Sequence, residues 1–104
     1  MILTNIELIP GKRVVRHLGL VQGSTVRAKN VGRDILASLK NLVGGELKGY
    51  TELLNEAREE ATSRMVRQAE AAGANAILNV RFSTSSITQG AAELFAYGTA
   101  VVVE

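Results

Sequence analysis

The sequence lacks cysteine altogether and holds one proline, one histidine and four aromatic residues among its 104 positions. Without cysteine the chain forms no disulfide, offers no thiolate to a metal and has no cysteine nucleophile. No apolar run approaches the roughly 18 residues that a membrane-spanning helix needs. The first segment, Met1–Ile9, has neither the basic stretch nor the small-residue cleavage site of a secretory signal. We therefore expect a cytoplasmic protein that is not inserted into a membrane.

A strong excess of charge of one sign is also missing, since twelve basic residues face ten acidic ones. A net charge of +2 is enough to bring the pI near 9.3, because arginine titrates so far from neutrality. The basic groups are spread from Lys12 to Arg81, and four aromatic residues are too few for a stacking platform, so we do not expect nucleic-acid binding. With 46% apolar residues and little net charge, the chain fits one folded domain.

The N-terminal region is typical of β-structure. Ile2–Thr4 is predicted as a short strand. From Lys12 to Lys29 the side chains alternate with the period of two that a strand requires. This stretch predicts one long bent strand, or two strands broken near Gln22–Ser24. Gly19 and Gly23 lie inside it and indicate bends or bulges, because glycine packs nothing there and permits unusual dihedral angles.

The middle of the chain is typical of two helices separated by glycines. Apolar residues recur at helical spacing from about residue 31 or 33 to Val43, which predicts a short amphipathic helix that ends at Gly44-Gly45. A longer helix is predicted from Glu52 to about Ala72, with Thr51 as its N-cap. The side chains that should form its inner stripe are mostly alanines: Leu54, Ala57, Ala61, Met65, Ala69 and Ala72.

The C-terminal third returns to strands. Residues 76–83 alternate between two sides, with apolar side chains expected together on one of them: Ala76, Leu78, Val80 and Phe82. Ala92–Val103 is predicted as a second strand that pairs with the first in an antiparallel hairpin. The order β-β-α-α-β-β indicates an α+β fold, in which a short and a long helix cover one face of an antiparallel sheet.

The other face of this predicted sheet is unusually apolar. It would show Phe95, Tyr97, Val101 and Val103, whereas a sheet face in water normally alternates more cleanly with polar residues. A large apolar patch usually marks an interface, so we expect these four residues to contact another copy of the chain. The alternative is that Met1–Ile9 and an edge loop cover the face within one subunit. If the face is an interface, an aspartate at Phe95 or Val101 breaks the assembly more than it unfolds the subunit.

Several separate segments, in the same order, resemble the YbjQ family. The stretches that carry the resemblance are Thr25–Asp34, Val43–Thr51, Gly73–Ala76, Arg81–Ser86, Gln89–Glu93 and Ala96–Ala100. The resemblance implies a single YbjQ-like domain over residues 1–104, assembled into a homo-oligomeric ring that is commonly a pentamer. Members have no assigned biochemical role and are often labelled "putative heavy-metal-binding".

The label proposes a metal, but the chain has few ligands for one. Soft metals prefer thiolate and imidazole donors, and only His17 qualifies. The candidate ligands are His17, Glu46 and Glu93, and a symmetric ring could gather one His17 or Glu46 from every subunit around its axis. The alternatives are that His17 is a surface or interface histidine and that Glu93 forms an ion pair, with Arg81 on the neighbouring strand as a natural partner or across a subunit interface.

The glycine-rich connector Gly44–Thr51 is the candidate small-ligand site. The start of a helix presents unpaired backbone N–H groups to an anion, and Glu46, Lys48 and Tyr50 could complete such a site. The alternative is a plain interhelical turn whose glycines supply special dihedral angles. No cofactor is assigned.

Three functions are compatible with these residues. We favour a non-enzymatic, cytoplasmic homo-oligomer that acts in binding or as a scaffold, because no catalytic constellation is evident and one sheet face needs a cover. The second is a metal or small-ligand binder that uses the subunit interfaces. The third is an enzyme with its site at the Gly44–Thr51 connector and Glu93.

Overall fold

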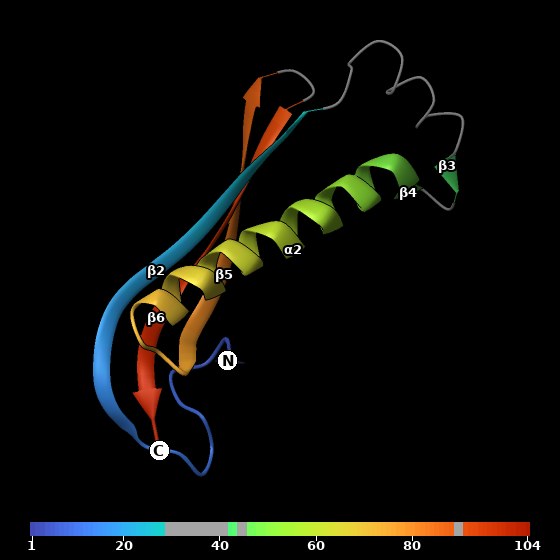
Figure 1. The fold of residues 1–104 in the computed structure, drawn as a ribbon. Coiled ribbons are helices and arrows are strands. Elements are labelled where there is room, and N and C mark those ends of the chain that lie inside the picture. The colour runs from blue at the N-terminus through green and yellow to red at the C-terminus, as the bar shows by residue number, and fades with distance from the viewer. Residues whose placement is uncertain (29–41, 44–45, 89–90) are drawn as a thin grey trace.

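The computed structural model describes residues 1–28, 42–43, 46–88 and 91–104, with side chains for 1–26, 51–86 and 91–104. These residues form a four-stranded sheet in the order β1-β5-β6-β2, one long helix and a separate two-stranded hairpin (Figure 1). The elements are β1 (Ile2–Leu3), β2 (Val14–Ala28), β3 (Leu42–Val43), β4 (Glu46–Leu47), α2 (Lys48–Ala71), β5 (Ala76–Thr88) and β6 (Ala91–Val103). The prediction of an α+β fold is confirmed.

The sheet is mixed, which corrects the expectation of a purely antiparallel one. β6 pairs antiparallel with both β2 and β5, as the hairpin prediction required. β1 instead runs parallel to β5, with Ile2 opposite Ala76. The Ile2 amide donates to the carbonyl of Asn75 at 3.1 Å, and the Thr4 amide to that of Ile77 at 3.0 Å. Two residues of strand were too short to reveal their direction from sequence.

The middle of the chain differs from the prediction. Most of the expected short helix falls on residues 29–41, outside the described residues, and its expected end is wrong because Leu42–Val43 is a strand paired with β4. Thr51 is not an N-cap, since α2 already begins at Lys48, directly after β4. The tertiary structure thus starts the helix before the residue that the capping preference of threonine indicated. The end was predicted well: α2 stops at Ala71, and Gly73 follows with φ of +89°.

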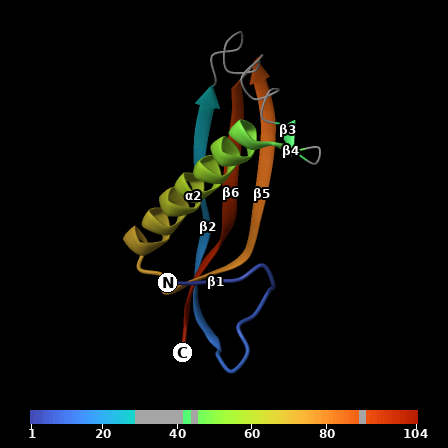
Figure 2. The same cartoon turned by 90° about the vertical axis from the view of Figure 1, so that its right-hand side faces the viewer.

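Helix α2 lies across one face of the sheet, over β2 and β6 (Figures 1 and 2). Its buried side chains are small, apart from one methionine, and pack on apolar side chains of the sheet: Ala57, Ala61, Met65 and Ala69 on the helix, with Val21, Ile77, Leu94, Ala96 and Ala100 on the strands. Gly23 marks the closest approach. A Cβ atom there would collide with the carbonyl oxygen of Ala61 and lie 2.5 Å from the amide nitrogen of Met65. Only glycine fits this position without moving the helix.

Two irregularities determine which side chains face the helix. Gly19 has φ of +103° beside a register shift in β2, which confirms one of the expected bulges. β5 has a second register shift, between Leu78 and Arg81, where Asn79 has φ of +54°. Because of this bulge, Phe82 lies opposite Ala96 on the helix side of the sheet. The expected grouping of residues 76, 78, 80 and 82 on one face is therefore wrong.

The molecule is elongated, measuring 52 × 25 × 16 Å, with a Cα radius of gyration of 16.9 Å. A compact domain of this length would have a radius of gyration of about 13 Å. The long strands and α2 thus leave more surface uncovered than a globule of the same mass would.

Candidate functional site

The sheet face opposite α2 has a covered half and an open half. Val101 and Val103 are 2% and 5% exposed, and they form a second small core with Ala76 and Leu78, against which Ile9 packs. The N-terminal segment therefore covers this half within one subunit. The expectation that Val101 and Val103 would need another chain to cover them is wrong, because the alternative considered for Met1–Ile9 holds at this end.

The open half contains a stacked aromatic pair on β6. The ring centroids of Phe95 and Tyr97 lie 5.3 Å apart with an interplanar angle of 30°. Both side chains are only partly buried in the single chain. Their cross-strand neighbours are polar: Ser24 and Ser83 beside Phe95, Gln22 and Arg81 beside Tyr97. Phe95 and Tyr97, two of the four residues expected at an interface, thus remain available for contact with another chain.

A groove runs along the helix side of β5, where α2 does not cover the sheet. It has a volume of about 390 Å³ and lies between α2 and Phe82; the residues that line it are Arg58, Glu59, Thr62, Ser63, Val66 and Phe82. A smaller hollow of about 270 Å³ adjoins the same ring from the side of β1 and is lined by Leu3, Thr4, Asn5 and Val80 as well. Phe82 is 47% exposed between them. Sequence reasoning missed this groove because the bulge at Asn79 moves Phe82 to this side.

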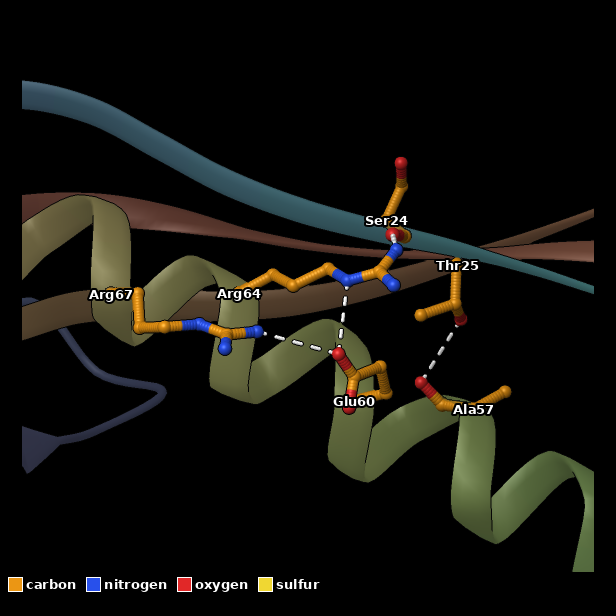
Figure 3. Close-up of polar contacts among 6 residues, drawn as sticks. All are labelled: Ser24, Thr25, Ala57, Glu60, Arg64 and Arg67. Carbon is orange, nitrogen blue, oxygen red and sulfur yellow. Dashed lines mark hydrogen bonds and ion pairs between the residues drawn. The ribbon is translucent and has the colours of Figure 1, made fainter.

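On the opposite edge of the sheet, side chains of α2 bind the backbone of β2 (Figure 3). The Arg64 guanidinium donates to the backbone carbonyl of Ser24 at 2.6 Å. The backbone amide of Gln22 donates to Oε1 of the Gln68 side chain, also at 2.6 Å. Oε1 of Glu60 accepts from Nε of Arg64 at 3.0 Å and from Arg67 at 3.3 Å. We call the contacts of Arg64 and Gln68 with β2, together with the Glu60 carboxylate that binds Arg64, the clasp. The helical spacing of Glu60 and Arg64 is evident in the sequence, but their contact with β2 is not.

One buried hydrogen bond supports the clasp. The Thr25 hydroxyl, which is 2% exposed, donates to the carbonyl oxygen of Ala57 at 3.1 Å. A hydroxyl buried without a partner would be destabilising, so this bond fixes the position of α2 along β2 (Figure 3).

The candidate metal ligands are not brought together. His17 is exposed on β2 opposite Val101, whereas Glu93 lies opposite Val26 and Ser85 toward the other end of β6. Eight residues of strand separate these two positions, a distance of about 26 Å. The backbone of Glu46 lies in β4, and its side chain is outside the described residues. Among the described residues, no group of three or more His, Cys, Asp or Glu side chains could hold a metal ion.

The predicted ion pair between Glu93 and Arg81 is not formed. Arg81 lies opposite Tyr97, four residues along β6 from Glu93, and it donates instead to the carbonyl oxygen of Asn5 at 2.6 Å. The register of the hairpin decides this, because residues four apart on one strand are about 13 Å apart.

The small-ligand candidates lie in two elements rather than in a connector between helices. Glu46 is in β4, and Lys48 and Tyr50 are in the first turn of α2. Their side chains lie outside the described residues, so the site stays a prediction.

Comparison with known proteins identifies the family. Residues 1–104 match the family model YbjQ_1, whose description is "Putative heavy-metal-binding". The chain belongs to the YbjQ family. A UPF0145 protein of Hahella chejuensis is 72% identical over 104 residues, the full length of both chains. A UPF0145 protein of Halorubrum lacusprofundi is 62% identical over 101 residues, covering 97% of each. The resemblance noted from the sequence is thereby confirmed.

A solved structure shows the same fold. The protein comes from Pediococcus pentosaceus, belongs to the DUF74 family and has no known function. It matches with a TM-score of 0.66 and 14% identity, covering 100% of this chain and 98% of that one. At this identity the likeness concerns the fold alone. In the part of the chain that the structure describes, no helix is both long and apolar enough to cross a membrane.

Proposed function

We propose that this YbjQ-family chain is a non-enzymatic, cytoplasmic protein that works as a homo-oligomeric ring, with five subunits as the working number, in binding or as a scaffold. The observation that carries the proposal is the excess surface of the single chain. Its accessible area is 6553 Å². A monomeric protein of the same mass exposes about 5,650 Å². The difference is close to the area, about 800 Å², that each partner buries in a standard interface.

The chemistry of this surface supports self-association. The open half of the sheet carries the Phe95–Tyr97 stack, and aromatic residues are enriched in the centres of protein interfaces. On β2, Leu20 is 71% exposed and Val26 is 57% exposed. An apolar surface of this kind is typical of a contact between chains.

Light scattering at several protein concentrations, coupled to size-exclusion chromatography, tests the proposal. We expect a single species several times heavier than the 11.1 kDa chain. A particle that stays at the mass of one chain at all concentrations would overturn it. Native mass spectrometry of the same sample counts the subunits and tests the number five.

Metal binding at subunit interfaces is the second candidate, because the description of the family names heavy metals. Within one subunit the described donors do not fit a metal site: His17 and Glu93 lie at different ends of the sheet. Only the symmetry of an oligomer could bring copies of His17 from different subunits close together. Native mass spectrometry after incubation with zinc, copper or nickel would then show an adduct that His17→Ala removes, and no stoichiometric adduct would argue against this candidate.

A further inference from the structure

The sheet face opposite α2 carries one basic and one acidic side chain on the described strands of its open half. Arg81 lies on β5 opposite Tyr97, and Glu93 lies four residues from Tyr97 along β6. Residues paired across strands share a face of the sheet, so both charged residues lie on the same face as the Phe95–Tyr97 stack. Phe95 stands midway between their two levels. The aromatic stack therefore has a positive charge toward one end and a negative charge toward the other.

Glu93 has no cationic partner among the described residues. Its cross-strand neighbours are Val26 on β2 and Ser85 on β5, and none of the ion pairs in the described part of the chain includes it. Its side chain is already partly buried, and Val26 beside it is 57% exposed. A second chain that covers Val26 and Phe95 would also cover this carboxylate. Burial of an unpaired charge is costly, so the covering chain must bring a cation.

Arg81 is a cation without a carboxylate partner among the residues that the structure describes. Its Nη1 donates to the backbone carbonyls of Asn5 and Val80, at 2.6 Å and 3.0 Å. A guanidinium has five N–H donors, which leaves those of Nε and Nη2 for a bidentate contact with a carboxylate. Glu93 of the same chain is out of reach, because four residues of strand separate the two levels by about 13 Å. A second copy supplies both the cation that Glu93 lacks and the carboxylate that Arg81 lacks.

We infer that Glu93 of one copy of the chain forms an ion pair with Arg81 of a neighbouring copy, across the face that holds the Phe95–Tyr97 stack. This inference rests on the proposed self-association and names the charge contact within it. The register makes the contact feasible: a second copy laid on this face and turned end over end above Phe95 has its Glu93 at the level of Arg81. Complementary charges of this kind fix the orientation of two partners and disfavour other orientations.

The pair joins two different residues, which determines how the contact repeats. Two copies that exchange both pairs form a closed two-fold contact. A copy that gives its Glu93 to one neighbour and its Arg81 to another makes a heterologous contact, which is the kind that closes into a ring. Both arrangements contain the same ion pair, and a mixture of variants distinguishes them.

Charge reversal tests the pair. Glu93→Arg and Arg81→Glu should each weaken association by about tenfold or more, because like charges then meet at the contact. The double variant Glu93→Arg/Arg81→Glu reverses both charges and should recover most of the lost association. Light scattering over a concentration series measures all three. If either single variant assembles like wild type, or if the double variant associates no better than the single variants, the inference is wrong.

Folding and net charge must be separated from the contact itself. Arg81→Glu also removes the bond to Asn5, but the double variant lacks that bond too, so its recovery cannot come from Asn5. Glu70→Arg makes the same change of net charge at an exposed position of α2 and should leave association unchanged. Urea unfolding and circular dichroism at the same concentrations show whether each subunit is intact. If Arg81→Glu does not fold, Glu93→Gln keeps the shape of its side chain and should still weaken association, whereas unchanged association contradicts the pair.

A mixture of the two single variants gives an independent test. Glu93→Arg keeps its own Arg81, and Arg81→Glu keeps its own Glu93, so each contact between unlike copies joins opposite charges. The mixture should therefore associate more tightly than either variant alone, and a mixture that stays dissociated contradicts the pair. A two-fold dimer or an even-numbered ring satisfies every contact, whereas an odd-numbered ring leaves one contact between like copies. Either particle supports the pair, and native mass spectrometry of the mixture shows which arrangement holds.

The proposed function and this inference fail in different ways. A wild-type protein that stays monomeric would defeat the proposed self-association. A wild-type protein that assembles, but whose association does not depend on the charges of Glu93 and Arg81, would defeat only the ion pair.

Discussion

The two halves of strand β6 have the same alternating pattern and very different surroundings. In one half, Val101 and Val103 face a cover made of the chain's own N-terminal segment. In the other half, Phe95 and Tyr97 face outward from the same side of the sheet and remain partly exposed. An apolar alternation thus predicts that a strand face is covered, but it does not distinguish a cover from the same chain from a cover supplied by another copy.

The largest effect should come from a charge in the covered half. Val101→Asp places a carboxylate in a site that is 2% exposed and has no basic partner in its core cluster. Burial of an unpaired charge is among the most destabilising changes known, so we expect a loss of about 4 kcal/mol or more, or no folded protein. Urea unfolding measures it. This reverses the earlier expectation that Val101→Asp would act mainly on assembly, and a stable monomeric variant would restore that expectation.

Helix α2 packs closely on β2 at Gly23, which has no side chain to hold the helix away. Gly23→Ala should cost about 1–3 kcal/mol, because the added methyl group meets the backbone of α2 at Ala61 and Met65. The control is Ser24→Ala, one residue along the strand, whose carbonyl contact with Arg64 is kept. Thermal unfolding of both variants decides the outcome: an equal Tm would show that the helix can shift without loss.

Sequence reasoning worked best where the pattern was long and regular. The long β2 strand, the β5–β6 hairpin, the end of α2 near Gly73 and most of its inner stripe were predicted; Ala72, expected in the stripe, is exposed and lies beyond the end of α2. The errors arose at short or irregular features. A two-residue strand carries no signal of direction, and the bulge at Asn79 reverses the facing of the following side chains of β5 as far as Ser86.

The candidate sites were harder to predict, because each depends on distant segments. The groove requires the bulge that turns Phe82 toward α2, and the clasp joins residues forty or more positions apart, as for Arg64 and Ser24. No local pattern encodes either arrangement. The charged and hydroxyl-bearing residues that looked chemically interesting in the sequence, such as Glu93 and Arg81, are placed apart by the hairpin register.

A charge placed in the open half should weaken the assembly rather than unfold the subunit. Phe95→Asp places the carboxylate on a partly exposed strand face, so the subunit should lose less than about 1 kcal/mol while the assembly dissociates. Phe95→Leu is the control and should keep the oligomer, because it stays apolar. Light scattering and urea unfolding, run together, separate the two effects. An unchanged particle mass in Phe95→Asp would exclude this face as the interface.

The smallest effect is expected at the clasp, where side chains of α2 bind the edge strand β2. Gln68→Ala removes the acceptor for the Gln22 amide, a loss of about 0.5–1.5 kcal/mol at most. Amide hydrogen exchange read by NMR should show faster exchange at Gln22, while the amide of Val80, bound to Thr4 at 2.9 Å on the other edge, should not change. Gln68→Glu keeps an acceptor and should preserve the protection. If Gln22 already exchanges in wild type as fast as an unprotected backbone amide, the clasp does not close the β2 edge.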